Sequence, residues 1–255
     1  MKSARLLVIG WFFQLKMLSR SSFNGILGIL YPLFFATVAF LMYRAGSPNA
    51  LLYASLGASV MGVWSAVSTS AGSAMQRERW QGTLELLVSA PAHFSLVMLP
   101  VTVAMSTIGL YSMAATLLWG WLLFGIDLHV AHPLLFCVSI VVTVVSIGVT
   151  GFLMAVAFVR YRTAWALGNL FEYPVWLVAG FLVPISLFPG WVRPISWLLA
   201  PTWGMNAIRE SALGGTPLPD VGLCAAIGVG CLVLGIAVTG TVLRSARARA
   251  TLALT

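Results

Sequence analysis

Charged side chains are scarce in this chain, so the few that occur together are the first candidates for chemistry. The sequence has 255 residues but only 14 Lys and Arg and 6 Asp and Glu. One short segment, from Gln76 to Pro91, holds four of these twenty charges: Arg77, Glu78, Arg79 and Glu85. Such a density of alternating charge is typical of a surface that a partner recognises.

The same segment carries the signals of a short helix that follows a longer one. Gly82 is expected to end the first helix and Thr83 to cap the second. Glu85 then lies in the first turn, where the helix dipole favours an acid. The apolar side chains of this helix, Leu84, Leu87 and Val88, are available to contact either lipid or a soluble partner.

A second candidate is Glu172, an acid inside an apolar stretch. It follows Arg162 by ten residues, about 15 Å along a helix, and Asn169 lies three residues before it on the same side. An acid buried at membrane depth is costly and marks a functional hypothesis. Two interpretations stay open. Glu172, with Asn169 and Tyr173, belongs to a transport path or its gating; or it is a neutral, hydrogen-bonded acid that shapes the helix before Pro174.

Other groupings offer weaker chemistry. Asp127, His129 and His132 form a minimal metal signal, which we interpret as a solvated loop. A phosphate-binding P-loop requires a lysine after its glycines, yet lysine occurs only at positions 2 and 16. We therefore expect no catalytic residue, metal or cofactor in this chain, and any ATP chemistry must belong to another chain.

The composition determines where these residues must lie. Hydrophobic residues make up 60% of the chain and charged residues 8%, against about 25% charged in a soluble domain. This excludes a soluble protein and predicts an all-α integral membrane protein. Six apolar stretches are expected to span the bilayer, the third tilted or broken near Pro100 or Gly109: Phe23–Tyr43, Ala50–Ala74, Phe94–Ile126, Pro133–Val159, Ala164–Val183 and Val221–Leu243.

Basic residues predict the orientation of the spans. With both termini cytoplasmic, 11 of the 14 basic residues lie inside, and only Arg44, Arg193 and Arg209 lie outside. We expect a multi-pass protein of the plasma (inner) membrane, and the predominance of Arg over Lys is typical of a bacterial protein. The net charge of +8 is then accounted for without nucleic acid.

Two segments flank or interrupt the spans. Residues 1–22 are predicted to form an amphipathic elbow helix, with Lys2, Arg5, Lys16 and Arg20 opposite Leu7, Trp11, Leu15 and Leu18. Lys16 and Arg20 also argue against a cleaved signal peptide. Between spans five and six, residues 184–220 contain four prolines before Gly214-Gly215, which predicts two short re-entrant helices at the outer face.

Small residues predict close helix packing. Every fourth residue from Ala54 to Ala74 is small, and Gly222, Ala226 and Gly230 repeat the pattern in the last span. Helices approach closely along such stripes. The stripe in the second span fits either a moving contact or static packing.

These features together resemble the type-2 ATP-binding cassette permeases, the export-type membrane subunits. The resemblance is carried by Arg77-Glu78-Arg79-x-x-Gly82-Thr83-Leu84-Glu85-x-Leu87, Glu172-Tyr173-Pro174, Phe188-Pro189 and the run from Trp203 to Gly214 with Ala207-Ile208-Arg209-Glu210. It covers the whole chain, as an elbow helix at 1–22 and a six-helix permease domain at 23–255.

The resemblance implies a permease subunit of an ATP-driven exporter. Two permease subunits, identical or sister chains, would pair over two cytoplasmic ATPase subunits that bind ATP and Mg²⁺. The loop at about 76–91 would be the coupling helix that fits a cleft in the ATPase. A lipophilic or amphiphilic cargo, such as a drug or lipid, is expected. The alternatives are a stand-alone proton-coupled transporter that uses Glu172 and a membrane scaffold that transports nothing.

Overall fold

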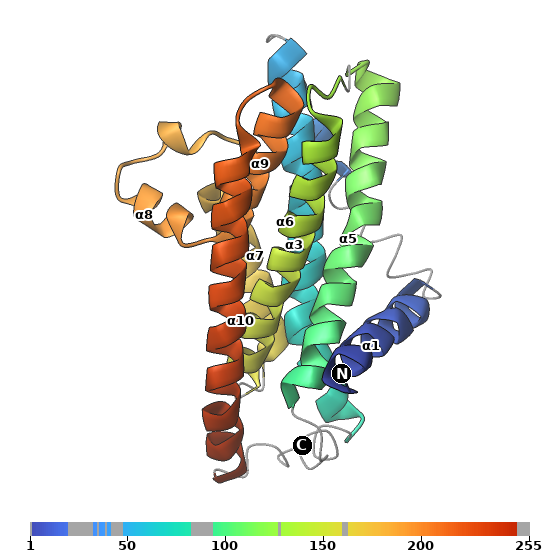
Figure 1. The fold of residues 1–255 in the computed structure, drawn as a ribbon, viewed down its shortest axis with the longest axis vertical. Coiled ribbons are helices and arrows are strands. Elements are labelled where there is room, and N and C mark those ends of the chain that lie inside the picture. The colour runs from blue at the N-terminus through green and yellow to red at the C-terminus, as the bar shows by residue number, and fades with distance from the viewer. Residues whose placement is uncertain are drawn as a thin grey trace.

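The computed structural model describes residues 2–19, 33–34, 36–38, 40–41, 48–82, 94–126, 129–159 and 163–248. Within these ranges the regular structure is entirely helical (Figure 1). The named elements are α1 (Lys2–Ser19), α3 (Pro48–Trp80), α5 (Phe94–Phe124), α6 (Pro133–Phe158), α7 (Ala164–Val178), η1 (Ile185–Leu187), α8 (Val192–Trp197), α9 (Ala200–Leu213) and α10 (Pro217–Ala248).

The long helices run side by side in one bundle, and α3 lies among several of them (Figure 1). It contacts α5, α6, α7 and α9, and its apolar side chains form much of the core. Its 33 residues extend over about 50 Å. A single helix therefore connects the two ends of the bundle.

Glycines on the neighbouring helices set how closely they approach α3. A Cβ atom at Gly109 of α5 would lie 2.7 Å from Cα of Val63. One at Gly151 of α6 would overlap Val67, and one at Gly168 of α7 would overlap the backbone oxygen of Ser68. Backbone contact of this kind stabilises helix pairs in lipid, where apolar burial gives little driving force.

Hydroxyl side chains in the core are accommodated locally. Ser55 and Ser59 donate to the carbonyl oxygens of Leu52 and Leu56, three residues earlier, at 2.8 and 2.7 Å. Thr143 donates to Ser139 O at 2.6 Å. These bonds within a helix let a serine-rich span lie in an apolar core without further partners.

Four described helices are long and apolar enough to cross a bilayer: α3 over Leu51–Ser73, α5, α6, and α10 over Pro217–Thr241. They correspond to the second, third, fourth and sixth predicted spans. The first predicted span, Phe23–Tyr43, falls largely outside the described residues. The expected break in the third span is absent, because α5 continues unbroken through Pro100 and Gly109.

The fifth predicted span is shorter than expected. α7 ends at Val178 after 15 residues, which is about 22 Å, against the roughly 30 Å of a bilayer core. Gly180 follows with a left-handed φ of +74°. The amide of Phe181 donates to Trp176 O and that of Gly180 to Leu177 O, which together form a Schellman motif.

The two stripes of small residues have different surroundings. Ala54 and Ala58 of α3 are fully buried within the bundle. A Cβ atom at Gly222 or Gly230 of α10, in contrast, would contact nothing within 4 Å. Within the described part of the chain, the stripe in the last helix therefore lies on the surface, away from the contacts between helices.

Helix α1 crosses the N-terminal part of α5 (Figure 1). Leu7 and Trp11, on the predicted apolar side, face α5, and the Trp11 indole nitrogen donates to Thr107 Oγ1 at 3.1 Å. Arg5 and Lys16 are exposed, as are Ile9 and Phe12. The apolar side thus packs on protein, and the exposed side mixes basic and apolar groups.

Candidate functional site

The charged segment begins at the last turns of α3. Arg77, Glu78 and Arg79 belong to this helix, which ends at Trp80, and the indole of Trp80 is 80% exposed. Gly82 has a φ of +67°, with open space around it. This fits the expectation that Gly82 ends the helix. Thr83, Leu84, Glu85 and Leu87 lie outside the described residues, as do the side chains of Arg77, Glu78 and Arg79.

Glu172 lies on the side of α7 that packs against α3. Its side chain is only 7% exposed, and the hydroxyl of Ser65 on α3 lies near its carboxyl group. The close approach of Gly168 to Ser68, one turn earlier in α7, holds the two helices together at this level. The structure thus places an acid at a close contact between α3 and α7.

The other two residues of the predicted group lie differently. Asn169 is half-buried on α7, one turn before Glu172. Tyr173 is exposed, and its ring meets that of Trp176 edge to face at 4.9 Å. Leu170, Phe171 and Leu177 are also exposed. Tyr173 therefore belongs to an outward-facing surface of α7, while Glu172 faces the core.

A third site, centred on Arg209, was not predicted from the sequence. Arg209 lies in α9 and is only 5% exposed. Its Nη1 donates to Gly180 O at 2.8 Å, and its Nη2 donates to Phe181 O at 2.5 Å and to Tyr53 O at 3.4 Å. The guanidinium group also lies 3.3 Å from the centroid of the Tyr53 ring. One side chain thus joins α3, the end of α7 and α9.

The early end of α7 explains why an arginine is buried there. A helix that stops inside an apolar layer leaves carbonyl groups that water cannot reach, and each unpaired one costs free energy. Ser196 of α8 donates to the carbonyl of the last helical residue, Val178, at 2.6 Å, and Arg209 pairs with the carbonyls of Gly180 and Phe181 in the non-helical segment that follows. A planar guanidinium with several donors suits this task better than an ammonium group.

The same place requires a glycine on α3. A Cβ atom at Gly57 would overlap the carbonyl oxygen of Phe181 and would lie 2.7 Å from Nη2 of Arg209. Gly57 therefore makes room for the backbone of the segment after α7 to lie directly on α3. We refer to Tyr53, Gly57, Gly180, Phe181 and Arg209 as the arginine clasp.

Glu210, next to Arg209, caps the C-terminal end of α9. Its Oε2 accepts a hydrogen bond from the amide of Thr216 at 2.9 Å, and its carbonyl accepts from Gly214 and Gly215. Gly214 has a φ of +89°, which confirms the predicted helix end. A cleft of about 350 Å³ opens beside the clasp, lined by Tyr53, Asn206, Arg209, Glu210, Leu213, Gly214 and Gly215.

One signal in the sequence pointed toward the clasp. Three of the four residues that lie three or four positions from Arg209 are apolar: Met205, Ala212 and Leu213. An arginine with such neighbours on its own side of a helix is expected to be buried with a partner. The partners are backbone carbonyls 28 and 29 residues away, and backbone acceptors leave no mark in a sequence.

Among the described residues, the remaining candidates are not brought together in a site. His129 and His132 are exposed, and Asp127 lies outside the described residues. Of the cysteines, Cys224 is buried and Ser146 of α6 donates to its backbone oxygen at 3.2 Å. These residues contribute to the loop and to the α6–α10 contact.

Comparison with known families identifies the chain. The model of the ABC-2 type transporter family matches residues 5–213, a span of 209 of the 255 residues. The chain belongs to the ABC-2 type transporter family. The match runs from the first turn of α1 to the end of α9, and so includes the acid of α7 and the arginine clasp. No curated protein matches the chain.

Membership assigns the general role of this ABC-2 protein. It is a multi-pass membrane permease component of an ABC transporter, and the family works with an ATPase component. Its apolar, helical architecture agrees with this role.

Proposed function

We propose that this ABC-2 protein is the permease subunit of an ATP-driven exporter, and that α3 transmits the motion of the ATPase. The observation that carries this proposal is the continuity of α3. The helix bears Arg77, Glu78 and Arg79 at one end, and Tyr53 and Gly57 of the arginine clasp at the other. A rigid helix moves both ends together, so a displacement at the charged segment reaches the clasp about 35 Å away.

The charged segment, residues 76–91, acts as the coupling helix in this proposal. Two ATPase subunits bind ATP and Mg²⁺ beneath a pair of permease subunits, which are two copies of this chain or this chain and a sister. Arg77, Glu78, Arg79 and Glu85 contact the ATPase, while Gly82 and Thr83 form the turn that presents Leu84 and Leu87. The exposed Trp80 supports this role, because a large aromatic side chain at a helix end suits an interface.

The cargo is a lipophilic or amphiphilic molecule such as a drug or lipid. A route lined by apolar and aromatic side chains, such as the exposed Leu170, Phe171 and Leu177 of α7, would suit this cargo class, and Glu172 with Asn169 supplies a polar point along α7. Both termini lie in the cytoplasm of a bacterial cell. A cysteine at Arg5 or Lys16 should then react with a membrane-impermeant maleimide only from the cytoplasmic side, and labelling of intact cells from outside contradicts this orientation.

The decisive experiment measures ATP turnover in membranes that contain this chain, a candidate ATPase chain, or both. Efflux of lipophilic dyes that requires both chains and ATP supports the proposal. Dye efflux by this chain alone, abolished by a protonophore, favours a proton-coupled transporter that uses Glu172. A chain that binds neighbouring proteins but supports neither activity is a scaffold.

A further inference from the structure

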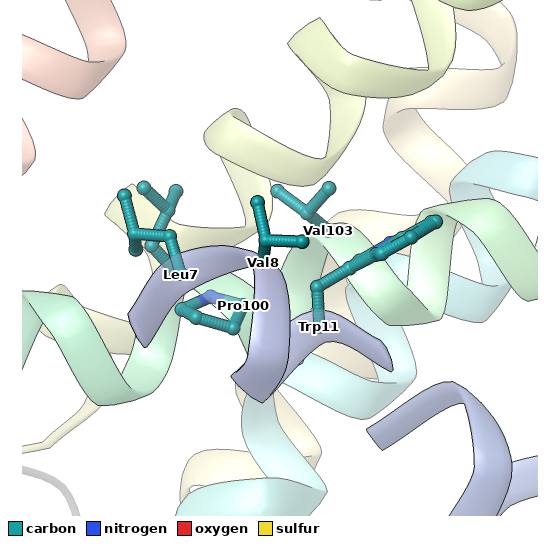
Figure 2. A pocket seen from close by; sticks show the side chains of 6 residues that line it. Leu7, Val8, Trp11, Pro100 and Val103 are labelled. Carbon is teal, nitrogen blue, oxygen red and sulfur yellow. The ribbon is translucent and has the colours of Figure 1, made fainter. Parts of the chain in front are cut away.

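A groove of about 190 Å³ lies between α1 and α5 (Figure 2). It is lined by Leu7, Val8 and Trp11 of α1 and by Leu99, Pro100 and Val103 of α5. All six side chains are apolar. In Figure 2, Pro100 lies beneath α1, and Trp11 and Val103 rise beside it.

The two helices cannot close this groove by moving together. A Cβ atom at Gly10 would lie 3.2 Å from Cβ of Pro100, so the backbone of α1 already approaches the proline ring closely. The bond from the Trp11 indole to Thr107, at 3.1 Å, fixes the aromatic wall. The space is therefore held open by backbone contact on one side and by an oriented indole on the other.

The surroundings of the groove indicate what enters it. α5 is apolar and long enough to span a bilayer, and Val8, at the groove, is 62% exposed. Ile9 and Phe12 of α1 are exposed as well. An occupant that reaches this groove arrives through a layer of hydrocarbon chains, and a hydrocarbon chain fits its lining.

The charge of α1 specifies the headgroup. Arg5 is exposed and precedes Val8 by three residues, which makes the two side chains neighbours on the helix surface. Lys16 is exposed near the other end of α1. α1 itself contains no acidic residue, so no acid within this helix offsets these charges. A negatively charged headgroup complements this surface.

We propose that the groove between α1 and α5 binds one acyl chain of an anionic phospholipid, whose headgroup lies against the basic side chains of α1. The lipid anchors α1 to the span on which it rests. The free energy of an acyl chain changes little when the chain moves from the bilayer into an apolar groove. Selectivity therefore comes from the headgroup, with an enrichment of about fivefold for each basic side chain that contacts it. The inference depends neither on the cargo nor on the ATPase.

Photolabelling of the full-length chain tests this proposal. The chain is reconstituted in nanodiscs with a trace of phosphatidylglycerol that carries a diazirine on one acyl chain, or with the matching phosphatidylcholine probe. After irradiation, mass spectrometry locates the labelled residues. We expect labels concentrated at 7–11 and 99–103, and at least about fivefold more from phosphatidylglycerol than from phosphatidylcholine.

Two substitutions and one control make the test specific to the groove. Val103→Phe fills the groove from α5, and Val8→Phe covers it from an exposed position of α1 that no core packing constrains. Each should lower labelling at 99–103 several-fold. Val141→Phe, on the exposed surface of α6, should leave it unchanged. Labels spread evenly over α5, α6 and α10, unchanged labelling in Val8→Phe, or equal labelling by both lipids would each overturn the proposal.

Discussion

Glu172 and Arg209 are the two charged residues that are buried within the described part of the chain, and they occupy different kinds of site. Backbone carbonyls and the Tyr53 ring surround Arg209, so its charge stabilises the fold. Glu172 lies near a serine hydroxyl on another helix. In the described contacts its carboxyl group caps no helix end, which suits a role in transport.

Truncating Arg209 should destabilise the protein. Arg209→Ala leaves the carbonyls of Gly180 and Phe181 buried and unpaired, at about 1–3 kcal/mol each, and Arg209→Lys retains the charge without the planar fork. We expect the midpoint of thermal unfolding in detergent to fall in both variants, further in Arg209→Ala. Arg193→Ala, at an exposed position on α8, is the matched control. Equal midpoints for Arg209→Ala and Arg193→Ala would show that the clasp contributes no stability.

Replacing Glu172 should reduce transport more than it reduces the yield of folded protein. Glu172→Gln keeps the size and the hydrogen-bonding capacity of the side chain but removes its ionisation. Dye efflux per folded molecule is measured in the presence of the ATPase. Ser65→Ala serves as the comparison, because it removes the nearby hydroxyl and leaves the acid. If Glu172→Gln lowers only the yield, with efflux per molecule intact, the acid has a structural role.

At the scale of elements, the long helices were predictable and the end of α7 was not. α3, α5, α6 and α10 follow from long apolar stretches, which need little tertiary information. The stretch Ala164–Val183 is equally apolar beyond Val178. What stops α7 there is the left-handed Gly180 together with Arg209 and Ser196, which come later in the chain. Such long-range capping cannot be recognised from hydropathy alone.

The sequence did not show which helices contact one another. The helical wheel grouped Leu7 and Trp11 on one side of α1, as the structure does, but could not identify α5 as the surface they contact. The stripes of small residues on α3 and α10 look alike in sequence. Only the structure shows that one is buried and the other open. The all-helical fold class and the positions of the second, third, fourth and sixth spans were therefore accessible from pattern, and helix pairing was not.

The α3–α7 contact provides a prediction for an element. Gly168→Ala places a Cβ atom on the backbone oxygen of Ser68, so α7 must shift away from α3, at about 1–3 kcal/mol of overpacking. We expect a lower unfolding midpoint and, because Glu172 lies one turn away, reduced efflux. Gly222→Ala is the matched control, since open space surrounds that position and alanine favours a helix by roughly 0.5–1 kcal/mol. A Gly168→Ala protein as stable as Gly222→Ala would contradict the close contact.

At the scale of the whole molecule, the bundle has two working ends connected by α3. One end holds the arginine clasp and its cleft, and the other holds the charged segment, which begins in the last turns of α3. Family membership implies that an ATPase component contacts the permease, and the charged segment offers the most concentrated set of charges in the chain. Packing within a membrane has no use for that density of charge, whereas the cleft of a soluble partner can recognise it.

Substitutions in this segment should therefore act on assembly. We expect Glu78→Ala, Glu85→Ala and Leu84→Asp each to weaken ATPase binding or to uncouple ATP hydrolysis from efflux, while the chain still inserts in the membrane. Truncating one partner of a buried charge pair at an interface costs about 2–5 kcal/mol, which corresponds to a loss in affinity of roughly 30-fold or more. Co-purification of the ATPase and ATP turnover are the measurements.

Leu84→Met is the matched control, because it retains an apolar side chain of similar volume and should bind the ATPase like the parent. A loss in Leu84→Asp that Leu84→Met does not share identifies the apolar contact, and losses in the two glutamate variants identify the charged one. If all three variants bind the ATPase and export dye like the parent, residues 76–91 form a solvated linker. The motion of the ATPase must then enter the permease somewhere other than the end of α3.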